Sequence, residues 1–203
     1  MYKVNEIFYS LQGEGFWTGT PMVFVRLSGC NLRCHFCDTN HAEFRLMTVE
    51  DIVKQVTALD PDNCGHVCIT GGEPLLQLKT DLIDALHRFY YSIHIETNGT
   101  RPVPRGVDWV TLSPKEDVKY IGPSAKVVLD QAHEVKLVYD GAITEERIEH
   151  WGRFPAKWHF LQPCDTSDSA RNAIINHATV DYIKNHSGTW RLSLQTHKLI
   201  GVR

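Results

Sequence analysis

The sequence lacks the features that mark several large classes of protein. Its 203 residues contain no apolar run close to the ~20 residues that a membrane-spanning helix needs. The first residues show no basic region leading into an apolar stretch, so a secretory signal is not expected. The chain has 21 basic and 24 acidic residues and a net charge of -3, with no excess of positive charge. This balance argues against a protein that coats nucleic acid through its phosphates.

Linkers, repeats and a disulfide framework are also missing. No Pro/Gly/Ser-rich linker, low-complexity segment or fixed-period repeat interrupts the chain, so residues 1–203 are expected to form one domain. A chain of this length can bury a sizeable core without disulfides. Three of its six cysteines lie within residues 30–37, which is unlike a disulfide scaffold. A reducing, cytoplasmic compartment and a metal or redox site fit this distribution better.

Short β-rich runs alternate with helical patterns along the chain. The spacing of apolar residues predicts helices at 49–59, preceded by a capping signature at Thr48, at 78–89 and at 169–184. The alternation predicts an α/β fold with parallel strands and outer helices. A complete eightfold barrel takes about 250 residues, so a partial TIM-like β/α barrel is expected. The predicted strands span residues 23–27, 66–70, 92–97, 108–112, 134–138, 158–162 and 190–195.

Polar groups follow nearly every predicted strand. Any one of these loops could be an ordinary polar turn. In parallel α/β sheets, however, ligands bind at the carboxyl ends of the strands, which share one rim. Together the loops predict one rim lined with chemically active side chains.

Cys30, Cys34 and Cys37 form a C-x3-C-x2-C motif directly after the first predicted strand of the parallel set. Because the three cysteines are close in sequence, their thiolates can all bind one small metal centre. A structural zinc site would need a fourth ligand, and no His or Cys stands at zinc-finger spacing. A 4Fe–4S cluster usually takes four thiolates, so three would leave one iron with an open site. Such an iron can bind a small molecule.

The segment from Gly71 to Pro74 (GGEP) follows the next strand of that set. Two glycines allow the backbone to approach a ligand closely, and proline stiffens the turn. The cysteine motif and this GGEP turn together resemble the radical S-adenosylmethionine superfamily. The resemblance implies that the open iron binds the amino and carboxylate groups of S-adenosylmethionine. The reduced cluster would then cleave this cofactor to methionine and a 5′-deoxyadenosyl radical.

The same resemblance implies the residues that contact the cofactor. Gly72 and Glu73 are expected to hold the methionine amino group, with Gly72 in direct contact. Phe36, Cys37 and Asp38 resemble the stretch that flanks the adenine. Two later loops would hold the ribose and adenine: Ser113, Pro114 and Lys115, and Gln162, Pro163, Cys164 and Asp165.

Three further segments narrow the resemblance within the superfamily. Residues 10–15 (SLQGEG), 96–100 (ETNGT) and 194–198 (LQTHK) are similar to the 7-carboxy-7-deazaguanine synthase family, and the likeness runs the length of the chain. It implies a lyase that converts 6-carboxy-5,6,7,8-tetrahydropterin to 7-carboxy-7-deazaguanine with loss of ammonia, in the route to queuosine. The alternatives are an activase of glycyl-radical enzymes, an iron–sulfur electron carrier and a zinc-binding module.

The family resemblance also implies the substrate site. Glu14 and Arg26 are the expected catalytic side chains, and a planar guanidinium suits the pterin carboxylate. Thr39 matches the position that ligates Mg²⁺, an ion that keeps most of its waters. A homodimer, a flavodoxin-like electron donor and no contact with nucleic acid or membrane are implied as well. The expected substrate contacts are Leu11, Gln12, Gly13, Glu14, Arg26, Thr70, His197 and Arg203, with His197 alternatively capping a strand end.

Two features depart from this pattern. The chain ends in Arg203, where the family commonly has a proline whose terminal carboxylate reaches the substrate. Arg203 keeps that carboxylate but adds a long basic side chain. Cys64 and Cys68 repeat the C-x3-C spacing. Cys68 lies within a predicted strand and is expected to be a small buried apolar side chain, whereas Cys64 is expected in a loop as a thiol.

Overall fold

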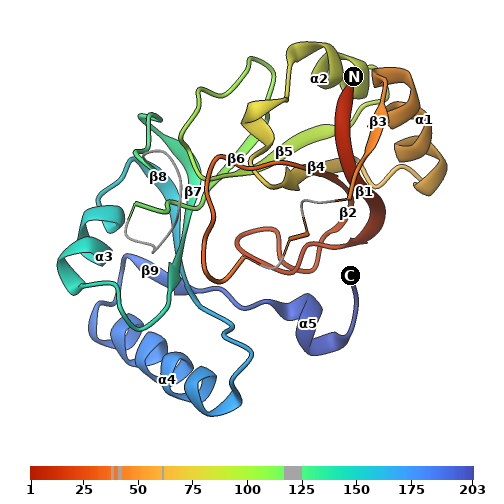
Figure 1. The fold of residues 1–203 in the computed structure, drawn as a ribbon. Helices are drawn as coiled ribbons and strands as arrows, with labels where there is room; N and C mark the ends of the chain where they lie inside the picture. The colour runs from red at the N-terminus through yellow and green to blue at the C-terminus, as the bar shows by residue number, and fades with distance from the viewer. Residues whose placement is uncertain (38, 41–42, 61, 117–124) are drawn as a thin grey trace.

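A computed structural model describes residues 1–37, 39–40, 43–60, 62–116 and 125–203. One curved nine-stranded sheet carries the fold, in the order β3-β1-β2-β4-β5-β6-β7-β8-β9, with helices on its outer face (Figure 1). The strands from β2 to β9 run parallel and form an open, partial barrel, as predicted. They are β2 (Pro21–Leu27), β4 (His66–Gly71), β5 (Ser92–Thr97), β6 (Trp109–Leu112), β7 (Ala132–Tyr139), β8 (Ala156–Pro163) and β9 (Trp190–Leu192).

Two antiparallel strands, β1 (Tyr2–Leu11) and β3 (Arg45–Met47), extend one edge of this sheet. The sequence pattern predicts parallel strands and indicates neither of these two. β1 carries polar residues on both faces and a register shift between Val4 and Glu6, so its alternation is broken. β3 is three residues long, too short to give a pattern. β1 and β2 form a hairpin joined by residues 12–20.

The helices α1 (Val49–Leu59), α2 (Thr80–His87) and α4 (Ser169–Asn185) lie where the sequence predicts them. Thr48 and Asp51 make the reciprocal capping box at the start of α1. The prediction of a strand at residues 190–195 is too long, because β9 ends at Leu192 and the chain turns into a short helix. The unpredicted helices are η1 (Pro74–Leu76), α3 (Glu145–Gly152) and α5 (Thr196–Ile200).

Two apolar clusters hold the helices on the sheet. The larger packs Ile52 and Leu82, from α1 and α2, against strands that include Ile69. The smaller packs Ile148 and Trp151 of α3 against β7 and β8. Among the described residues, no helix is long and apolar enough to cross a membrane.

The hairpin loop of residues 12–20 lies inside the curve of the sheet (Figure 1). Phe16 stacks on Trp109 of β6 and Trp158 of β8, each with ring centroids 5.1 Å apart. The Phe16 amide donates to Glu134 Oε2 at 2.9 Å. Trp17 packs edge-on against His94 of β5 at 5.0 Å. The loop therefore fills space that other strands would enclose in a complete barrel.

Candidate active site

A cavity of about 1100 Å³ opens along the carboxyl ends of the parallel strands and the inner face of the β1–β2 hairpin. It gathers nearly every predicted site residue. Glu73 and Pro114 do not line it, and Asp38 lies outside the described residues. The predicted residues that line it are Leu11, Gln12, Gly13, Glu14, Arg26, Cys30, Cys34, Phe36, Cys37, Thr39, Thr70, Gly72, Ser113, Lys115, Gln162, Pro163, Cys164, Asp165, His197 and Arg203.

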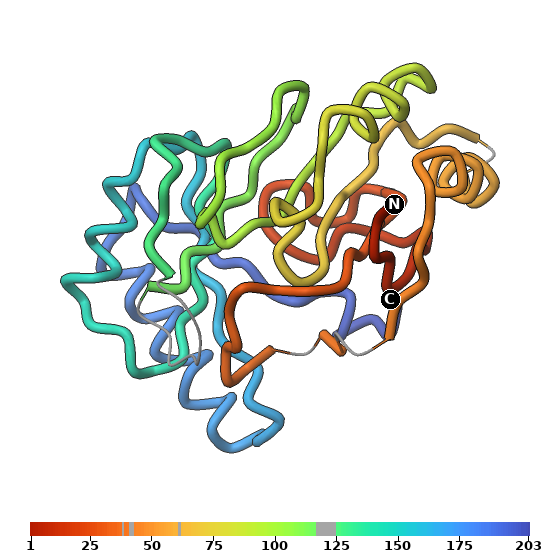
Figure 2. The backbone as a smooth tube through the Cα atoms, turned by 45° about the horizontal axis from the view of Figure 1, so that its top comes forward, coloured from red at the N-terminus to blue at the C-terminus, as the bar shows by residue number. Residues whose placement is uncertain are grey.

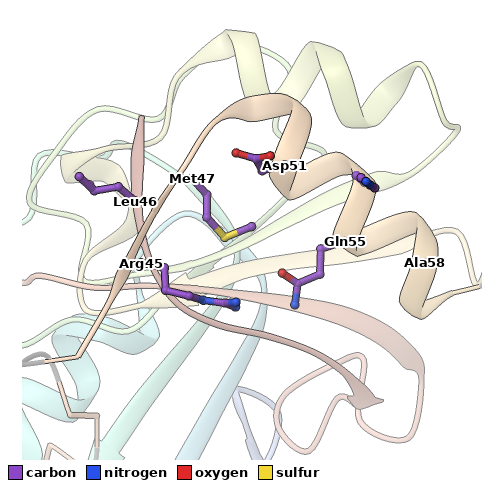
Figure 3. Close-up of a pocket in the computed structure, with 7 residues that line it drawn as sticks. Arg45, Leu46, Met47, Asp51, Gln55 and Ala58 are labelled. Atoms are coloured by element: carbon purple, nitrogen blue, oxygen red, sulfur yellow. The ribbon is translucent and has the colours of Figure 1, made fainter.

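A second hollow of about 390 Å³ lies between β3 and α1 (Figure 3). It is lined by ordinary surface side chains, including Arg45 and Gln55. Its one carboxylate, Asp51, already caps α1 through Thr48. No predicted site residue lies there, so the large cavity is the candidate site.

The cysteine loop forms one end of the cavity. Cys30 and Cys34 are half-buried and Cys37 is exposed. Burial raises the pKa of the thiols of Cys30 and Cys34. All six cysteines are described, and none of these thiols is in a disulfide; Cys68 is buried within β4, as predicted, and Cys64 packs beside the larger core cluster.

The GGEP turn packs directly on the start of the cysteine loop. A Cβ on Gly72 would lie 2.0 Å from Gly29 O, and one on Gly71, whose φ is +125°, would lie 2.0 Å from Leu27 O. Two backbone hydrogen bonds join the segments: Gly72 N to Leu27 O at 3.0 Å and Glu73 N to Gly29 O at 2.9 Å. The two glycines were predicted to let the backbone approach a ligand. In the structure they let it approach the backbone of residues 27–29, and Gly72 also lines the cavity.

Glu73 lies beneath this turn, with 1% of its surface exposed. Its carboxylate accepts hydrogen bonds from the Leu75 amide at 3.0 Å, the Thr97 hydroxyl at 2.7 Å and the Asn98 amide at 2.7 Å. Burial raises the pKa of Glu73, and these donors oppose the rise. The structure thus places Glu73 as the clamp between the GGEP turn and the loop after β5, away from the cavity wall.

The loop after β5 holds the cysteine loop from the other side. Asn98 Nδ2 donates to Asn31 Oδ1 at 3.1 Å, and Asn31 Nδ2 donates to Thr100 Oγ1 at 2.9 Å. Asn31 stands between Cys30 and Leu32, so both amides fix the path of the cysteine motif. Sequence reasoning noted residues 96–100 only as a family segment. The positioning role of Asn98 had no signal in the spacing of the residues.

Glu14 lines the same cavity beside a lysine that was not among the predicted site residues. Lys136 of β7 contacts the Glu14 carboxylate and lies 3.1 Å from Glu96 Oε2. Gln195 Nε2 donates to Glu14 Oε1 at 2.9 Å. Burial alone would raise the pKa of Glu14, but the Lys136 ammonium lowers it to about 2. A lysine inside the predicted strand 134–138 was the signal that could have identified this group.

Two guanidinium groups share one carboxylate at the cavity edge. Arg26 Nε donates to Glu6 Oε1 at 2.9 Å, and Arg203 contacts the other oxygen of Glu6. Both guanidinium groups lie over the Phe8 ring, at 5.9 and 5.2 Å from its centroid. Ser10 Oγ donates to the Arg203 carbonyl. Figure 2 shows how the C-terminal segment returns to β1. The departure at Arg203 therefore adds a second cation beside Arg26.

His197 does not cap a strand end, because it lies in α5. Its ring sits against Gly13, where a Cβ would be 2.0 Å from Nδ1. Thr196 anchors the same contact, since its amide donates to Gly13 O at 3.0 Å. The hairpin loop and the C-terminal helix thus form one wall.

The end of β8 and the loops after β6 and β8 complete the lining of the cavity. Lys115 Nζ donates to Ser113 O at 2.9 Å, and burial lowers the pKa of this lysine. Gln162 Oε1 accepts from Ser193 Oγ at 2.7 Å, which orients its amide. Hydrogen bonds from the Ser167 amide and the Asn172 side chain lower the pKa of Asp165 to about 2.

Comparison with known proteins agrees with this geometry. The Radical SAM superfamily model matches residues 24–148. A 7-carboxy-7-deazaguanine synthase of Bacteroides thetaiotaomicron is 48% identical over 203 residues, covering 100% of both chains. One from Neisseria meningitidis is 38% identical, covering 99% of this chain and 94% of its own. The crystal structure of QueE from Escherichia coli superposes with a TM-score of 0.73 at 30% identity, covering 97% of this chain and 94% of that one.

The chain belongs to the 7-carboxy-7-deazaguanine synthase family. Its match to the superfamily model spans the cysteine motif, the GGEP turn and β2 to β7. The predicted radical enzyme and partial barrel are therefore confirmed. The alternatives of an activase, an electron carrier and a zinc-binding module are set aside.

Members of this synthase family use a 4Fe–4S cluster, S-adenosylmethionine and Mg²⁺. The donor set of this chain fits the cluster, because three thiols from one loop border the same cavity. The lining of the cavity also includes predicted contacts of S-adenosylmethionine, such as the Gly72 backbone and the polar side chains of Ser113 and Gln162. Thr39 lines the same cavity; one hydroxyl is a weak magnesium ligand alone, but Mg²⁺ keeps waters and takes oxygens of a substrate as further ligands.

Proposed function

We propose that this protein converts 6-carboxy-5,6,7,8-tetrahydropterin to 7-carboxy-7-deazaguanine with loss of ammonia, through a radical ring contraction that serves the queuosine and 7-deazapurine route. One observation carries the proposal: a single cavity is lined by the three cysteines together with Glu14, Arg26 and Arg203. That arrangement brings a cofactor and an anionic, nitrogen-rich substrate together.

At the cofactor end, Cys30, Cys34 and Cys37 would hold the 4Fe–4S cluster. When bound, the cluster and S-adenosylmethionine supply a 5′-deoxyadenosyl radical. The Gly72 backbone is proposed to receive the methionine amino group, and Glu73 and Pro114 to act indirectly by fixing their loops. The side chains and backbone proposed to hold adenine and ribose are Phe36, Asp38, Ser113, Lys115, Gln162, Pro163, Cys164 and Asp165.

At the substrate end, the guanidinium of Arg26 is proposed to bind the pterin carboxylate. Bidentate pairing of these planar groups fixes direction as well as charge. Glu14 and Gln12 would accept and donate hydrogen bonds along the ring edge, because carboxylate and amide oxygens match ring N–H groups. Thr39 would hold Mg²⁺ near the substrate oxygens. Leu11, Gly13, Thr70 and His197 are proposed as the remaining contacts.

Several wider properties are part of the proposal. The whole of residues 1–203 is proposed to act as one radical SAM core domain, supported by the sheet that runs from β1 to β9. A flavodoxin-like protein is proposed as the electron donor, and a homodimer as the working form, on the strength of the family likeness. The absence of a disulfide among these described cysteines is compatible with work in the reducing cytoplasm.

The test is an anaerobic assay with reconstituted protein, S-adenosylmethionine, Mg²⁺, dithionite and 6-carboxy-5,6,7,8-tetrahydropterin. Mass spectrometry should detect 7-carboxy-7-deazaguanine and 5′-deoxyadenosine. Cys34→Ala should abolish both, whereas Cys64→Ala, outside the cavity, should abolish neither. Formation of 5′-deoxyadenosine without the deazaguanine would refute the substrate assignment while preserving the radical chemistry.

A further inference from the structure

Lys136 is a buried cation to which the proposed function gives no task. It stands in the middle of β7, and only 4% of its side chain is exposed. Its ammonium contacts Glu14 and lies 3.1 Å from Glu96 Oε2. A lysine is almost never fully buried unless it is paired, so these two carboxylates are what keep it inside the barrel.

The two carboxylates are held on their other sides by amides. Gln195 Nε2 donates to Glu14 Oε1 at 2.9 Å, and Gln12 Nε2 donates to Glu96 Oε1 at 3.1 Å. Gln12 Oε1 in turn accepts from the Glu14 amide at 3.1 Å. In each carboxylate, therefore, one oxygen contacts the lysine ammonium and the other accepts a hydrogen bond from a glutamine. Both glutamates and both glutamines also line the cavity.

Other charged groups face this cluster from the neighbouring elements. They are Glu134 on β7, Lys115 after β6 and His197 on α5. Glu134 is already engaged by the Thr111 hydroxyl at 2.8 Å and the Phe16 amide at 2.9 Å. Lys115 is bound to Ser113. Lys136 is thus the cation in direct contact with Glu14 and Glu96 among the described residues.

We infer that Lys136 is a positioning residue that keeps Glu14 ionised and aims the oxygens of Glu14 and Glu96 at adjacent N–H donors of the substrate. This inference rests on the proposed function. Without the cation, the Glu14 carboxylate, 13% exposed, would lie beside the Glu96 carboxylate with no compensating charge, and a neighbouring like charge favours protonation of Glu14. A protonated carboxyl would present a donor where an acceptor is needed. The substrate ring, with its neighbouring amide and amine N–H groups, would then bind less tightly.

Lys136→Met tests the inference, because it removes the charge and keeps the length of the side chain. Lys136→Arg, which keeps the charge, is the matched control. Infrared spectra of holoenzyme labelled with ¹³C-carboxyl glutamate should show one additional protonated carboxyl at neutral pH in Lys136→Met and none in Lys136→Arg. The KM for the pterin should rise about tenfold or more in Lys136→Met, with kcat changed far less. Lys136→Arg should recover part of the KM.

The affinity for S-adenosylmethionine separates this role from general damage to the cavity, and it should stay unchanged in Lys136→Met. Should that variant fold poorly, Lys136→Met/Glu96→Gln removes one charge of each sign; it should restore thermal stability but not KM. Carboxylates that stay ionised in Lys136→Met, with an unchanged KM, would overturn the inference. Equal KM increases in the methionine and arginine variants would do the same. If the wild type turns over no pterin, the proposed function fails, and the infrared titration alone decides the role of Lys136.

Discussion

The contact between Arg203 and Glu6 shows how one residue at the edge of a site can matter for binding and little for stability. The Arg203 side chain is 69% exposed, and an ion pair so open to solvent contributes less than about 1 kcal/mol. Its position beside Arg26 is more important, because Glu6 holds both guanidinium groups near the Phe8 ring. Two neighbouring guanidinium groups favour the binding of a substrate carboxylate, because its two oxygens can accept hydrogen bonds from both.

Arg203→Ala should therefore raise the KM for the pterin about three- to tenfold, through loss of one charge-assisted hydrogen bond and of the constraint on Glu6. The melting temperature should change little. Steady-state kinetics and thermal unfolding measure the two effects, with Arg153→Ala, an exposed pair on α3, as the control. A large drop in melting temperature with an unchanged KM would show that Arg203 serves the fold instead.

At the scale of elements, the cysteine loop depends on two neighbouring loops for its shape. The GGEP turn holds its start, and the Asn98–Thr100 segment holds Asn31. None of these contacts uses a thiol. The start of the loop, up to Asn31, is therefore positioned by backbone and amide groups rather than by the thiols.

Gly72→Ala should disturb that path, because the new Cβ would meet Gly29 O at 2.0 Å and neither backbone can yield easily. We expect iron and sulfide content per chain to fall by more than half, together with the absorbance of the cluster. Gly188→Ala is the matched control: Gly188 has φ +109° and open space around it, so alanine strains the backbone there without a steric clash. If both variants lost the cluster equally, general instability would be the cause.

The sequence predicted several elements from local apolar runs and capping signals. The pattern of residues 92–97 gives β5 with its observed bounds, and Thr48 with Asp51 gives the start of α1. It did not predict β1, whose motif residues obscure its alternation, or α5, whose side chains are all at least partly exposed. The site was predictable where chemistry has a fixed spacing, as in the cysteine motif. Lys136 had one signal, a charged side chain inside a predicted strand, but its partners Glu96 and Glu14 lie 40 and 122 positions away; Asn98 had none, and it reaches Asn31 across 67 positions.

At the scale of the whole molecule, a histidine buried inside the open barrel should make the free energy of unfolding depend on pH. His94 lies 3% exposed between Trp17 and Trp109, with His66, Asp108 and His133 as the titratable groups around it. Burial, with His66 adding to it, lowers the pKa of His94 from 6.5 to about 4. The unfolded chain therefore binds this proton at a higher pH than the folded one.

The contribution of His94 should be complete above pH 6.5 and lost as the pH falls towards 4, an effect of up to about 3 kcal/mol. His94→Phe keeps the ring and removes the titration. Urea unfolding followed by tryptophan fluorescence at pH 7 and pH 5 should show a smaller loss for this variant than for the wild type. Identical losses would assign the acid sensitivity to other groups.

The contacts of Gly13 and Glu14 with Thr196 and Gln195 span more than 180 positions of the chain. During synthesis, the segments that clasp the cysteine loop, up to Thr100, leave the ribosome about a hundred residues before those partners do. The segments that hold the cysteine loop are therefore synthesised well before the segment that contacts Gly13 and Glu14, so this wall of the cavity stays incomplete until the last residues of the chain are made.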